Sequence, residues 1–392
     1  MAVLLLTIFI DLIGFGMVIP VLPFMVLQYG GDAQMGGYLV AIYSLMAVIS
    51  GPFWGRLSDR IGRRPALMLT LLGAAGSYVV LAVADSLAMV FVARALSGAM
   101  AGNVGIVMAA IADITSPEDR ARGMGFLGAS FGLGFTVGPA LSGLLSGTPD
   151  NPDLSAPALV AAGLSALAFT LAAWRMPETS ERAPAGSEGP AEAAPPLTAF
   201  LDTPAKLMLL AQFVITAIAQ SAVFTITGYW ADSVLGWSQR EVAFLLMGVG
   251  LIVATVQAFA VAPVTRRFGE VQGYGMGLAV SIIGCALLLA FPRQIPVILV
   301  AFPMVMGGLT MCYPMLNSLM SQRNDRRHQG AALGLSNGCA AMGRVFGPIF
   351  SGLLFAQMGA GAPFLLVMAL GALALAWSVG QTRRDRRDRR QL

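Results

Sequence analysis

Long apolar stretches follow one another along the whole chain and are separated by short polar connections. A helix that crosses the hydrocarbon core of a bilayer needs about 20 mainly apolar residues. Twelve stretches reach that length, and we predict a membrane helix in each. Their approximate bounds are 2–27, 36–57, 65–84, 87–113, 123–147, 154–175, 203–231, 240–265, 271–291, 295–320, 329–356 and 361–380. They leave no room for a soluble catalytic domain, so we expect an all-α integral membrane protein that is not an enzyme.

The composition agrees with this pattern. Of the 392 residues, 57% are hydrophobic and only 11% are charged, whereas soluble domains carry about 25% charged residues. Three cysteines within apolar stretches and a single histidine predict neither a disulfide scaffold nor a zinc site. The chain has no GxxxxGK[ST] run that could bind ATP. We therefore expect no metal and no cofactor.

Arginines gather in alternate connections and in the tail. The connections after the second, fourth, eighth and tenth stretches contain Arg60, Arg63, Arg64, Arg120, Arg122, Arg266, Arg267, Arg323, Arg326 and Arg327, and Arg56 comes just before the first of them. The opposite connections contain only Arg240 and Arg293. Basic loops stay on the cytoplasmic side, so we predict a multi-pass protein of the cell inner (plasma) membrane with both termini cytoplasmic. The basic tail, 381–392, is expected to contact anionic lipid headgroups and not nucleic acid.

A polar segment and an internal repeat divide the chain into halves. Residues 177–202 are rich in Pro, Ala, Glu and Gly and predict a cytoplasmic linker between six-helix bundles at 1–176 and 203–380. Residues 125–143 match residues 334–352 at a constant offset of 209. The matching pairs are Gly125 and Gly334, Gly134 and Gly343, Gly138 and Gly347, Pro139 and Pro348, Ser142 and Ser351, and Gly143 and Gly352. Paired halves of this kind are typical of transporters whose substrate site lies between them.

Two ionisable residues, Asp11 and Arg94, lie well inside the predicted membrane helices of the first half. Asp11 is about 14 Å into the first helix at 1.5 Å per residue, and Arg94 is long enough to extend inward from the fourth helix to meet it. Such groups are costly in a bilayer and are functional candidates. Our hypothesis is that Asp11 carries protons and that Arg94 tunes it. The alternative is a static pair that only positions the two helices.

Several segments together carry a family resemblance. They are Asp11 to Pro23, Gly55 to Pro65, Arg94-x-x-x-Gly98, residues 111–126 and Gly125 to Gly143. These segments resemble the helix and loop motifs of the major facilitator superfamily, and within it of the twelve-helix drug/proton antiporters, above all the tetracycline efflux proteins. Val253 and Ser281 stand where tetracycline exporters carry a His and an Asp. The chain therefore lacks both ionisable groups of that proton route.

The resemblance implies a function. We expect a monomeric secondary transporter that exports small amphipathic or drug-like molecules by alternating access, driven by protons. The alternative within the class is a proton-coupled permease for a sugar, a peptide or another metabolite.

The resemblance also implies roles for the motif residues. In the family, the loop motif latches the halves in the outward-facing state: the equivalent of Asp59 docks at the start of helix 11, and an arginine pairs with the acid at the end of helix 4, here Asp113. The latch candidates are Gly55, Asp59, Arg60, Arg63 and Asp113. The alternative is a loop that only fixes topology. The antiporter motif, Gly125, Gly134, Gly138, Pro139 and Gly143, is expected to pack tightly and hinder leak.

Polar and aromatic residues on the predicted central helices are candidates to line the substrate cavity. They are Phe15, Asn103, Met108, Gln220, Phe224, Tyr229, Trp230, Gln257, Tyr313 and Asn317. For each of them, lipid contact or helix packing stays open as the alternative, but the amides are favoured because an amide in a membrane helix needs a partner. Arg344 is expected to line the cavity, to pair with Asp11 or another acid, or to extend to the membrane surface.

Overall fold

The chain folds almost entirely into helices. The computed structural model describes residues 1–148, 151–179, 203–324 and 329–391. Within these ranges, twelve helical segments are long and apolar enough to cross a membrane, which confirms the predicted all-α membrane architecture. The only strands in the same ranges are β1 (Gly147–Thr148) and β2 (Asn151–Pro152), a two-residue antiparallel pair.

The molecule divides into two compact units. Unit 1 contains Met1–Ser187 and Gly228–Leu251, and unit 2 contains Glu188–Thr227 and Ile252–Leu392. This division differs from the predicted bundles, 1–176 and 203–380, because residues 228–251 pack with the first six membrane segments. Beyond Thr179, the predicted linker lies outside the described residues.

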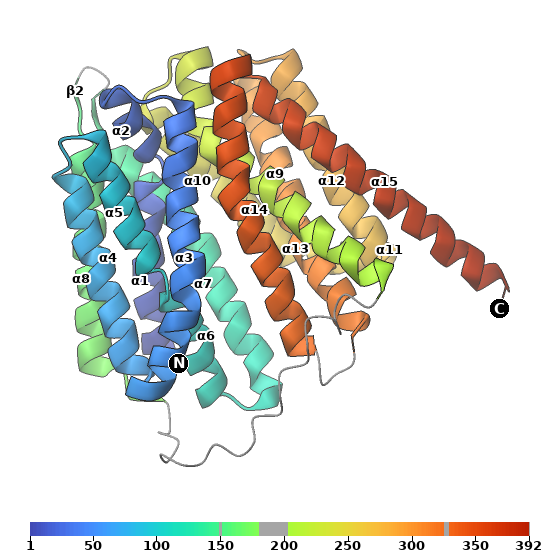
Figure 1. Ribbon diagram of the computed structural model, residues 1–392, viewed down its shortest axis with the longest axis horizontal. Helices are drawn as coiled ribbons and strands as arrows, with labels where there is room; N and C mark the ends of the chain where they lie inside the picture. Colours follow the sequence, from blue (N-terminus) through green and yellow to red (C-terminus); the bar gives the residue numbers. More distant parts are fainter. Residues whose placement is uncertain (149–150, 180–202, 325–328, 392) are drawn as a thin grey trace. The chain divides into compact units, whose positions relative to one another are not determined.

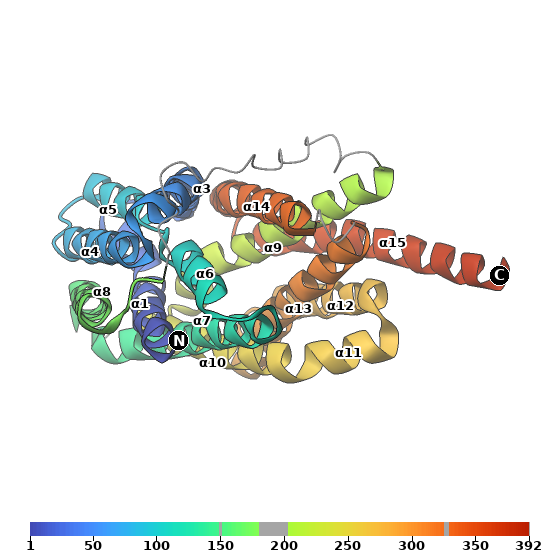
Figure 2. The same cartoon turned by 90° about the horizontal axis from the view of Figure 1, so that it is seen from below.

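Unit 1 is built around its first helix. Its helices are α1 (Ala2–Val18), α2 (Leu22–Gln28), α3 (Ala33–Ile61), α4 (Arg63–Ala82), α5 (Leu87–Ala99), α6 (Asn103–Ile114), α7 (Pro117–Leu145) and α8 (Ser155–Arg175). Helix α1 packs against α7 and α8, and α4 packs against α8 and α5 (Figures 1 and 2). Leu4, Ile8 and Leu12 of α1 form one buried cluster with side chains of α4 and α6. A polar group on the inner face of α1 is therefore buried among several helices.

Two of the predicted membrane helices are interrupted. The first stops at Val18 and resumes at Leu22, around Pro20, which has no backbone N–H to continue the helix. The fourth stops at Ala99 and resumes at Asn103. The prediction of one continuous helix over 2–27 and another over 87–113 is therefore wrong at these two points.

A neighbouring tryptophan stabilises the second break. The Trp54 indole N–H donates to the carbonyl of Ala99 over 2.7 Å, which satisfies an acceptor that the interrupted helix leaves free. A Cβ on Gly102 would collide with the Trp54 ring, so a glycine is needed there. The break thus places the start of α6 in the middle of the membrane segment Leu87–Ile114.

Glycines let α1 and α7 approach closely. A Cβ on Gly138 would lie 2.6 Å from the Ile13 carbonyl oxygen and 2.8 Å from Gly16 Cα. A Cβ on Gly134 would lie 2.8 Å from Leu12 Cβ. Small residues at such crossings let helix backbones pack in lipid, where water gives no hydrophobic drive to association.

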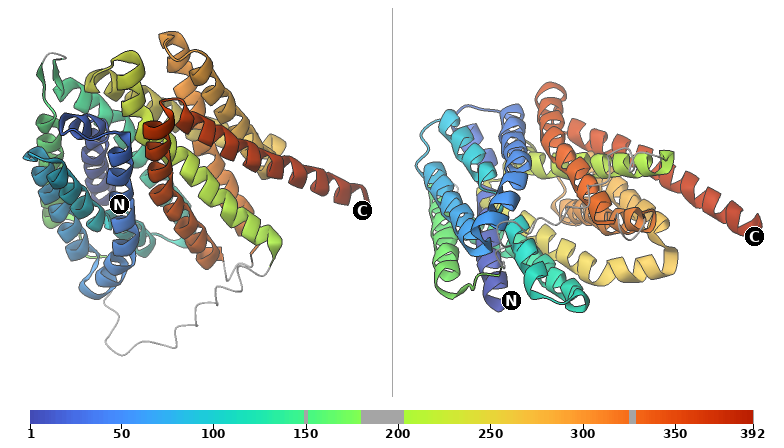
Figure 3. Two further views of the ribbon diagram at one scale, coloured as in Figure 1. Left: turned by 45° about the horizontal axis from the view of Figure 1, so that its top comes forward. Right: turned by 60° about the horizontal axis from the view of Figure 1, so that its bottom comes forward.

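Unit 2 contains the remaining helices. They are α9 (Pro204–Leu235, in unit 1 from Gly228), α10 (Gln239–Thr255, in unit 1 up to Leu251), the π-helical segment η2 (Val256–Ala260), α11 (Val261–Phe268), α12 (Glu270–Ala290), α13 (Ile295–Gln322), α14 (Gln329–Met358) and α15 (Ala362–Gln391). Helix α12 packs between α13 and α15, and the end of α15 runs on past its neighbours to the C-terminus (Figures 1 and 3). The predicted basic tail thus continues α15 as far as Gln391.

The internal repeat of the sequence recurs in the packing of unit 2. Gly343 and Gly347 occupy on α14 the places that Gly134 and Gly138 occupy on α7. A Cβ on Gly343 would lie 2.5 Å from Ala217 Cβ and 2.7 Å from the Val214 carbonyl oxygen, both on α9. The two glycine motifs therefore do the same work in each unit, one against α1 and the other against α9.

A carboxylate outside the membrane segments starts α8. Asp153 Oδ1 accepts the backbone N–H groups of Ala156 and Ser155 over 2.9 and 3.0 Å. These bonds, with that from Ala156 the strongest influence, lower the pKa of Asp153 from its usual value.

We expect Gly138→Ala to destabilise the protein, because the added methyl group meets backbone atoms of α1 that cannot move aside. Overpacking of this kind costs about 1–3 kcal/mol. Thermal unfolding in detergent measures the loss. Gly128→Ala on the same helix is the matched control, since its Cβ would meet nothing within 4 Å. Equal melting temperatures for the two variants would contradict the packing described.

Candidate functional site

The carboxyl group of Asp11 lies at the centre of unit 1. Its side chain is 3% exposed. Ser165 on α8 donates to Asp11 Oδ1 over 2.9 Å, and Asn103 donates to Oδ2. Both partners are neutral, so the carboxyl group is hydrogen-bonded without being tied to a cation.

The break between α5 and α6 positions one of these partners. Asn103 is the first residue of α6, and its Oδ1 accepts the N–H of Val104 over 2.8 Å while its amide group points to Asp11. The start of a helix carries a partial positive charge that favours a nearby anion. The sequence analysis proposed Asn103 as a cavity residue, and the structure places it directly on Asp11.

A small cavity of about 90 Å³ adjoins Asp11. Aromatic side chains, Phe15, Tyr43, Tyr78 and Phe131, line much of it together with Asn103. The Phe15 ring lies 5.5 Å from that of Tyr43 and 5.9 Å from that of Phe135. One water molecule takes about 30 Å³ of liquid, so the cavity has the volume of a few waters next to the carboxyl group.

The expected contact between Arg94 and Asp11 is not formed. The Arg94 guanidinium lies 4.2 Å from the centre of the Tyr43 ring, an arrangement that a cation–π interaction stabilises. Its Nε is buried without a hydrogen-bond partner in the described part of the chain. The Tyr78 hydroxyl is near enough to interact electrostatically with both Arg94 and Asp11. Tyrosines at 43 and 78 therefore stand where the sequence analysis expected an ion pair.

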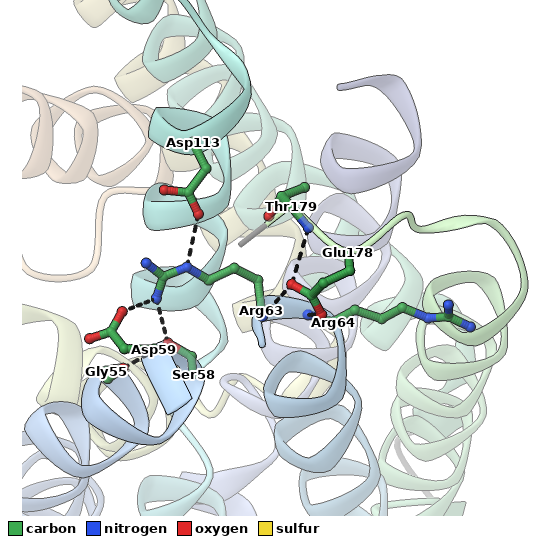
Figure 4. A network of polar contacts seen from close by, with 8 residues as sticks. All are labelled: Gly55, Ser58, Asp59, Arg63, Arg64, Asp113, Glu178 and Thr179. Carbon is green, nitrogen blue, oxygen red and sulfur yellow. Dashed lines mark hydrogen bonds and ion pairs between the residues drawn. The ribbon is translucent and has the colours of Figure 1, made fainter. Parts of the chain in front are cut away.

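A second polar cluster joins the ends of α3, α4 and α6 (Figure 4). Arg63 Nη1 lies 2.6 Å from Asp59 Oδ1, and Arg63 Nε donates to Asp113 Oδ2 over 3.0 Å. Ser58 accepts a further bond from Arg63 over 2.7 Å, and its own hydroxyl donates to the Gly55 carbonyl. Arg63 is therefore the residue that binds the three helix ends together.

The chain beyond α8 is tied to the same cluster. Glu178 accepts the backbone N–H of Arg63 over 2.7 Å and that of Arg64 over 3.2 Å (Figure 4). These are N–H groups of the first turn of α4, which have no partner within the helix. Glu178 therefore caps α4 and fixes the point from which the predicted linker departs.

Residues 228–251 close against the rest of unit 1. The Tyr229 side chain reaches the backbone of Gly36, Gln239 donates to Ser142 Oγ over 3.2 Å, and Gly143 packs against Ala243. We call this set of contacts the seam. Trp230 next to it is 2% exposed and packs inside unit 1.

The candidates on unit 2 occupy different surroundings. Gln220 on α9 donates to Thr310 on α13 over 3.0 Å. Tyr313 and Asn317 follow on α13 and are half-buried, as is Phe224 on α9. Gln257 lies in η2 and is exposed, and Arg344 lies on α14 and is exposed. Met108, on α6 of unit 1, is also exposed, with 44% of its surface accessible.

A family model matches most of the chain. The model described as "Major Facilitator Superfamily" matches residues 4–323 and 232–392 of this chain. The chain belongs to the Major Facilitator Superfamily. It is thus a member of a family of multi-pass membrane transporters, as the resemblance of its motifs implied.

Individual superfamily members resemble the chain over most of its length. It is 32% identical over 362 residues to "Tetracycline resistance protein, class C" of Escherichia coli, covering 89% of this chain and 88% of that protein. It is 28% identical to "Multidrug resistance protein 1" of Bacillus subtilis (strain 168), covering 96% of each. A solved structure, that of the human organic anion transporter MFSD10 (TETRAN), superimposes with a TM-score of 0.69 at 25% identity, covering 96% of this chain and 98% of that one.

Some motif residues are packed against other helices, and others have open surroundings. Gly134 and Gly138 pack on α1, and Gly143 packs in the seam. Gly125 has open space at its Cβ position, and Arg60 is exposed at the end of α3. Pro139 contacts Gly16 of α1, since a Cβ on Gly16 would lie 3.3 Å from its ring.

Sequence reasoning missed three residues near Asp11. Ser165, Tyr43 and Tyr78 come from three other helices, and none stands in a recognisable motif. A serine or tyrosine in an apolar helix is compatible with packing, lipid contact or a polar site, so composition alone does not single these residues out.

We expect Arg63→Gln to lower the free energy of unfolding by about 1 kcal/mol, because two partly exposed charge-assisted contacts are lost. Arg60→Gln is the matched control, since it removes the same charge from a neighbouring exposed position. Thermal unfolding and efflux assays of both variants check this. Equal melting temperatures and equal efflux for the two variants would contradict a stabilising role of the Arg63 cluster.

Proposed function

We propose that this superfamily member is a proton-coupled exporter of small amphipathic or drug-like molecules that works by alternating access. The observation that carries the proposal is the Asp11 carboxyl group, buried in a membrane bundle, with an amide and a hydroxyl as partners and a cavity beside it. The names of the tetracycline and multidrug resistance relatives support export of small organic compounds.

The partners of Asp11 suit a group that changes charge. An ion pair would hold the carboxylate ionised, whereas the hydroxyl of Ser165 can donate to the ionised form and accept from the protonated one. The amide of Asn103 donates in the ionised state. A proton can therefore be gained or lost by turning hydrogen bonds without breaking a salt bridge.

The remaining parts of the proposal follow from sequence and position. Arg94 tunes the proton affinity of Asp11 without touching it, because the Tyr78 hydroxyl interacts electrostatically with both side chains. The Arg63 cluster holds one end state, with Asp59 docking at the start of the eleventh membrane segment. The transporter acts as a monomer in the inner (plasma) membrane with its termini in the cytoplasm, in contact with anionic lipid.

We expect Asp11→Asn to abolish accumulation driven by an imposed pH gradient in proteoliposomes, while exchange of substrate down its own gradient continues. Asparagine has the size and shape of a protonated aspartic acid side chain but cannot release a proton in this range. The probes are tetracycline and a panel of fluorescent amphiphilic dyes. Asp153→Asn is the control, because asparagine caps a helix as well as aspartate does.

Other outcomes would redirect the proposal. Gradient-driven transport that survives in Asp11→Asn places the proton site elsewhere. Resistance to no compound in a broad panel, in a host that lacks its own exporters, favours the proton-coupled metabolite permease. Transport indifferent to the pH gradient in the unaltered protein contradicts proton coupling altogether.

Residues 228–251 come from the second half of the sequence, and the seam joins them to helices of the first half. Alternating access requires these two halves to separate, so the seam has to open. A Cβ on Gly143 would lie 3.1 Å from Ala243 Cβ, close to the spacing of about 3.5–4.5 Å in disulfides. We expect oxidation of the double variant Gly143→Cys/Ala243→Cys to stop transport and a reductant to restore it. Each single variant, treated alike, controls for the three native cysteines. Normal transport by the cross-linked protein would show that the seam does not need to open.

A further inference from the structure

Arg344 carries a charge at the middle of a membrane helix. It lies 15 residues after the start of α14 at Gln329 and 14 before its end at Met358. At 1.5 Å per residue it is about 21 Å from the nearer helix end. A charged side chain at this depth is rare, costly and almost always turned towards a polar partner or a water-filled cavity.

The packing of α14 decides which way Arg344 faces. The neighbouring Gly343 sits against the backbone of Val214 and Ile218, and Gly347 sits against Ser221, so this face of α14 is in contact with α9. Each residue turns the helix by about 100°. Arg344 therefore projects from a different face, and its side chain is exposed.

Tyr313 on α13 is the neighbour of Arg344 in unit 2. The guanidinium is close enough to Tyr313 for the two side chains to interact electrostatically. The Tyr313 hydroxyl oxygen is buried, the Arg344 guanidinium is its polar neighbour, and no other described residue bonds to it. Thr310 and Asn317, one turn away on the same face of α13, add polar groups, and Thr310 is already bonded to Gln220.

The described part of unit 2 offers Arg344 no counterion. Glu270 is the only acidic residue there whose side chain is described, and it accepts hydrogen bonds from Ser318 and Gln322 over 3.0 and 2.7 Å. Among the described residues, the ion pairs are those of Arg63. Asp11 is hydrogen-bonded to Asn103 and Ser165. Arg344 is thus a fixed positive charge to which no carboxylate of the described chain is paired.

We propose that Arg344 and Tyr313 form a subsite for the anionic group of the transported molecule. The guanidinium is a planar set of donors that matches a carboxylate or a similar oxyanion, and the phenol supplies a further donor. The substrates are then amphipathic organic anions or zwitterions. This inference rests on the proposed transport of small organic molecules and names the charge that they carry.

The test compares two probes that differ only in charge. 7-Methoxycoumarin-3-carboxylate and its neutral carboxamide share one ring system, and their binding to the purified protein is measured by fluorescence polarisation in the absence of a pH gradient. We expect the unaltered protein to bind the carboxylate at least tenfold more tightly than the carboxamide. The preference should vanish in Arg344→Gln, persist in Arg344→Lys and weaken in Tyr313→Phe.

The controls separate recognition from folding and from proton coupling. Arg344→Lys retains the charge, and equal melting temperatures of the variants show that Arg344→Gln is folded. Binding is measured at equilibrium, so a failure of gradient-driven transport leaves this result unaffected. Equal affinity for the two probes, a preference that survives in Arg344→Gln, or binding of neither probe would overturn the proposed subsite.

Discussion

A carboxyl group inside an apolar helix bundle constrains much of unit 1. Burying Asp11 without partners would be prohibitively costly, and the fold supplies them from two other segments, Ser165 on α8 and Asn103 at the start of α6. Asn103 can reach it because the fourth membrane helix is broken, and the break is itself stabilised by the bond from Trp54 to Ala99. A single buried acid thus links a helix interruption, a tryptophan and two polar side chains into one arrangement.

Both units pack two helices together through a pair of glycines, but the helices carry different charged residues. Gly134 and Gly138 bring α7 onto α1, and their counterparts 209 residues later, Gly343 and Gly347, bring α14 onto α9. The helices so joined carry opposite charges: Asp11 lies on α1, and Arg344 lies on α14. The glycine packing is therefore repeated in both units, whereas Asp11 and Arg344 have no counterpart of the same charge in the other unit. The functions that we propose rest on these two charged residues.

The sequence predicted the number of membrane helices, their bounds to within a few residues and the pairing of Gly134 with Gly343, because apolar length and glycine spacing are local signals. The interruptions near Pro20 and Gly102 were missed, since hydropathy alone does not register a break inside an apolar stretch. The partner of Asp11 was wrongly expected to be Arg94. Charge complementarity favoured that pair, but Tyr43 takes up the guanidinium, and only the three-dimensional arrangement of α3 and α5 shows this. Residues 228–251 group with unit 1 through contacts between residues distant in sequence, which hydropathy does not register.

The central claim is that Asp11 gains and loses a proton during transport. Infrared difference spectroscopy of the reconstituted protein, recorded as pH is stepped and as substrate is added, observes this group directly through the carbonyl band of a protonated carboxylic acid. We predict a band that disappears as pH rises, changes when substrate binds and is missing in Asp11→Asn. A spectrum in which no such band depends on Asp11 at any pH would contradict the account.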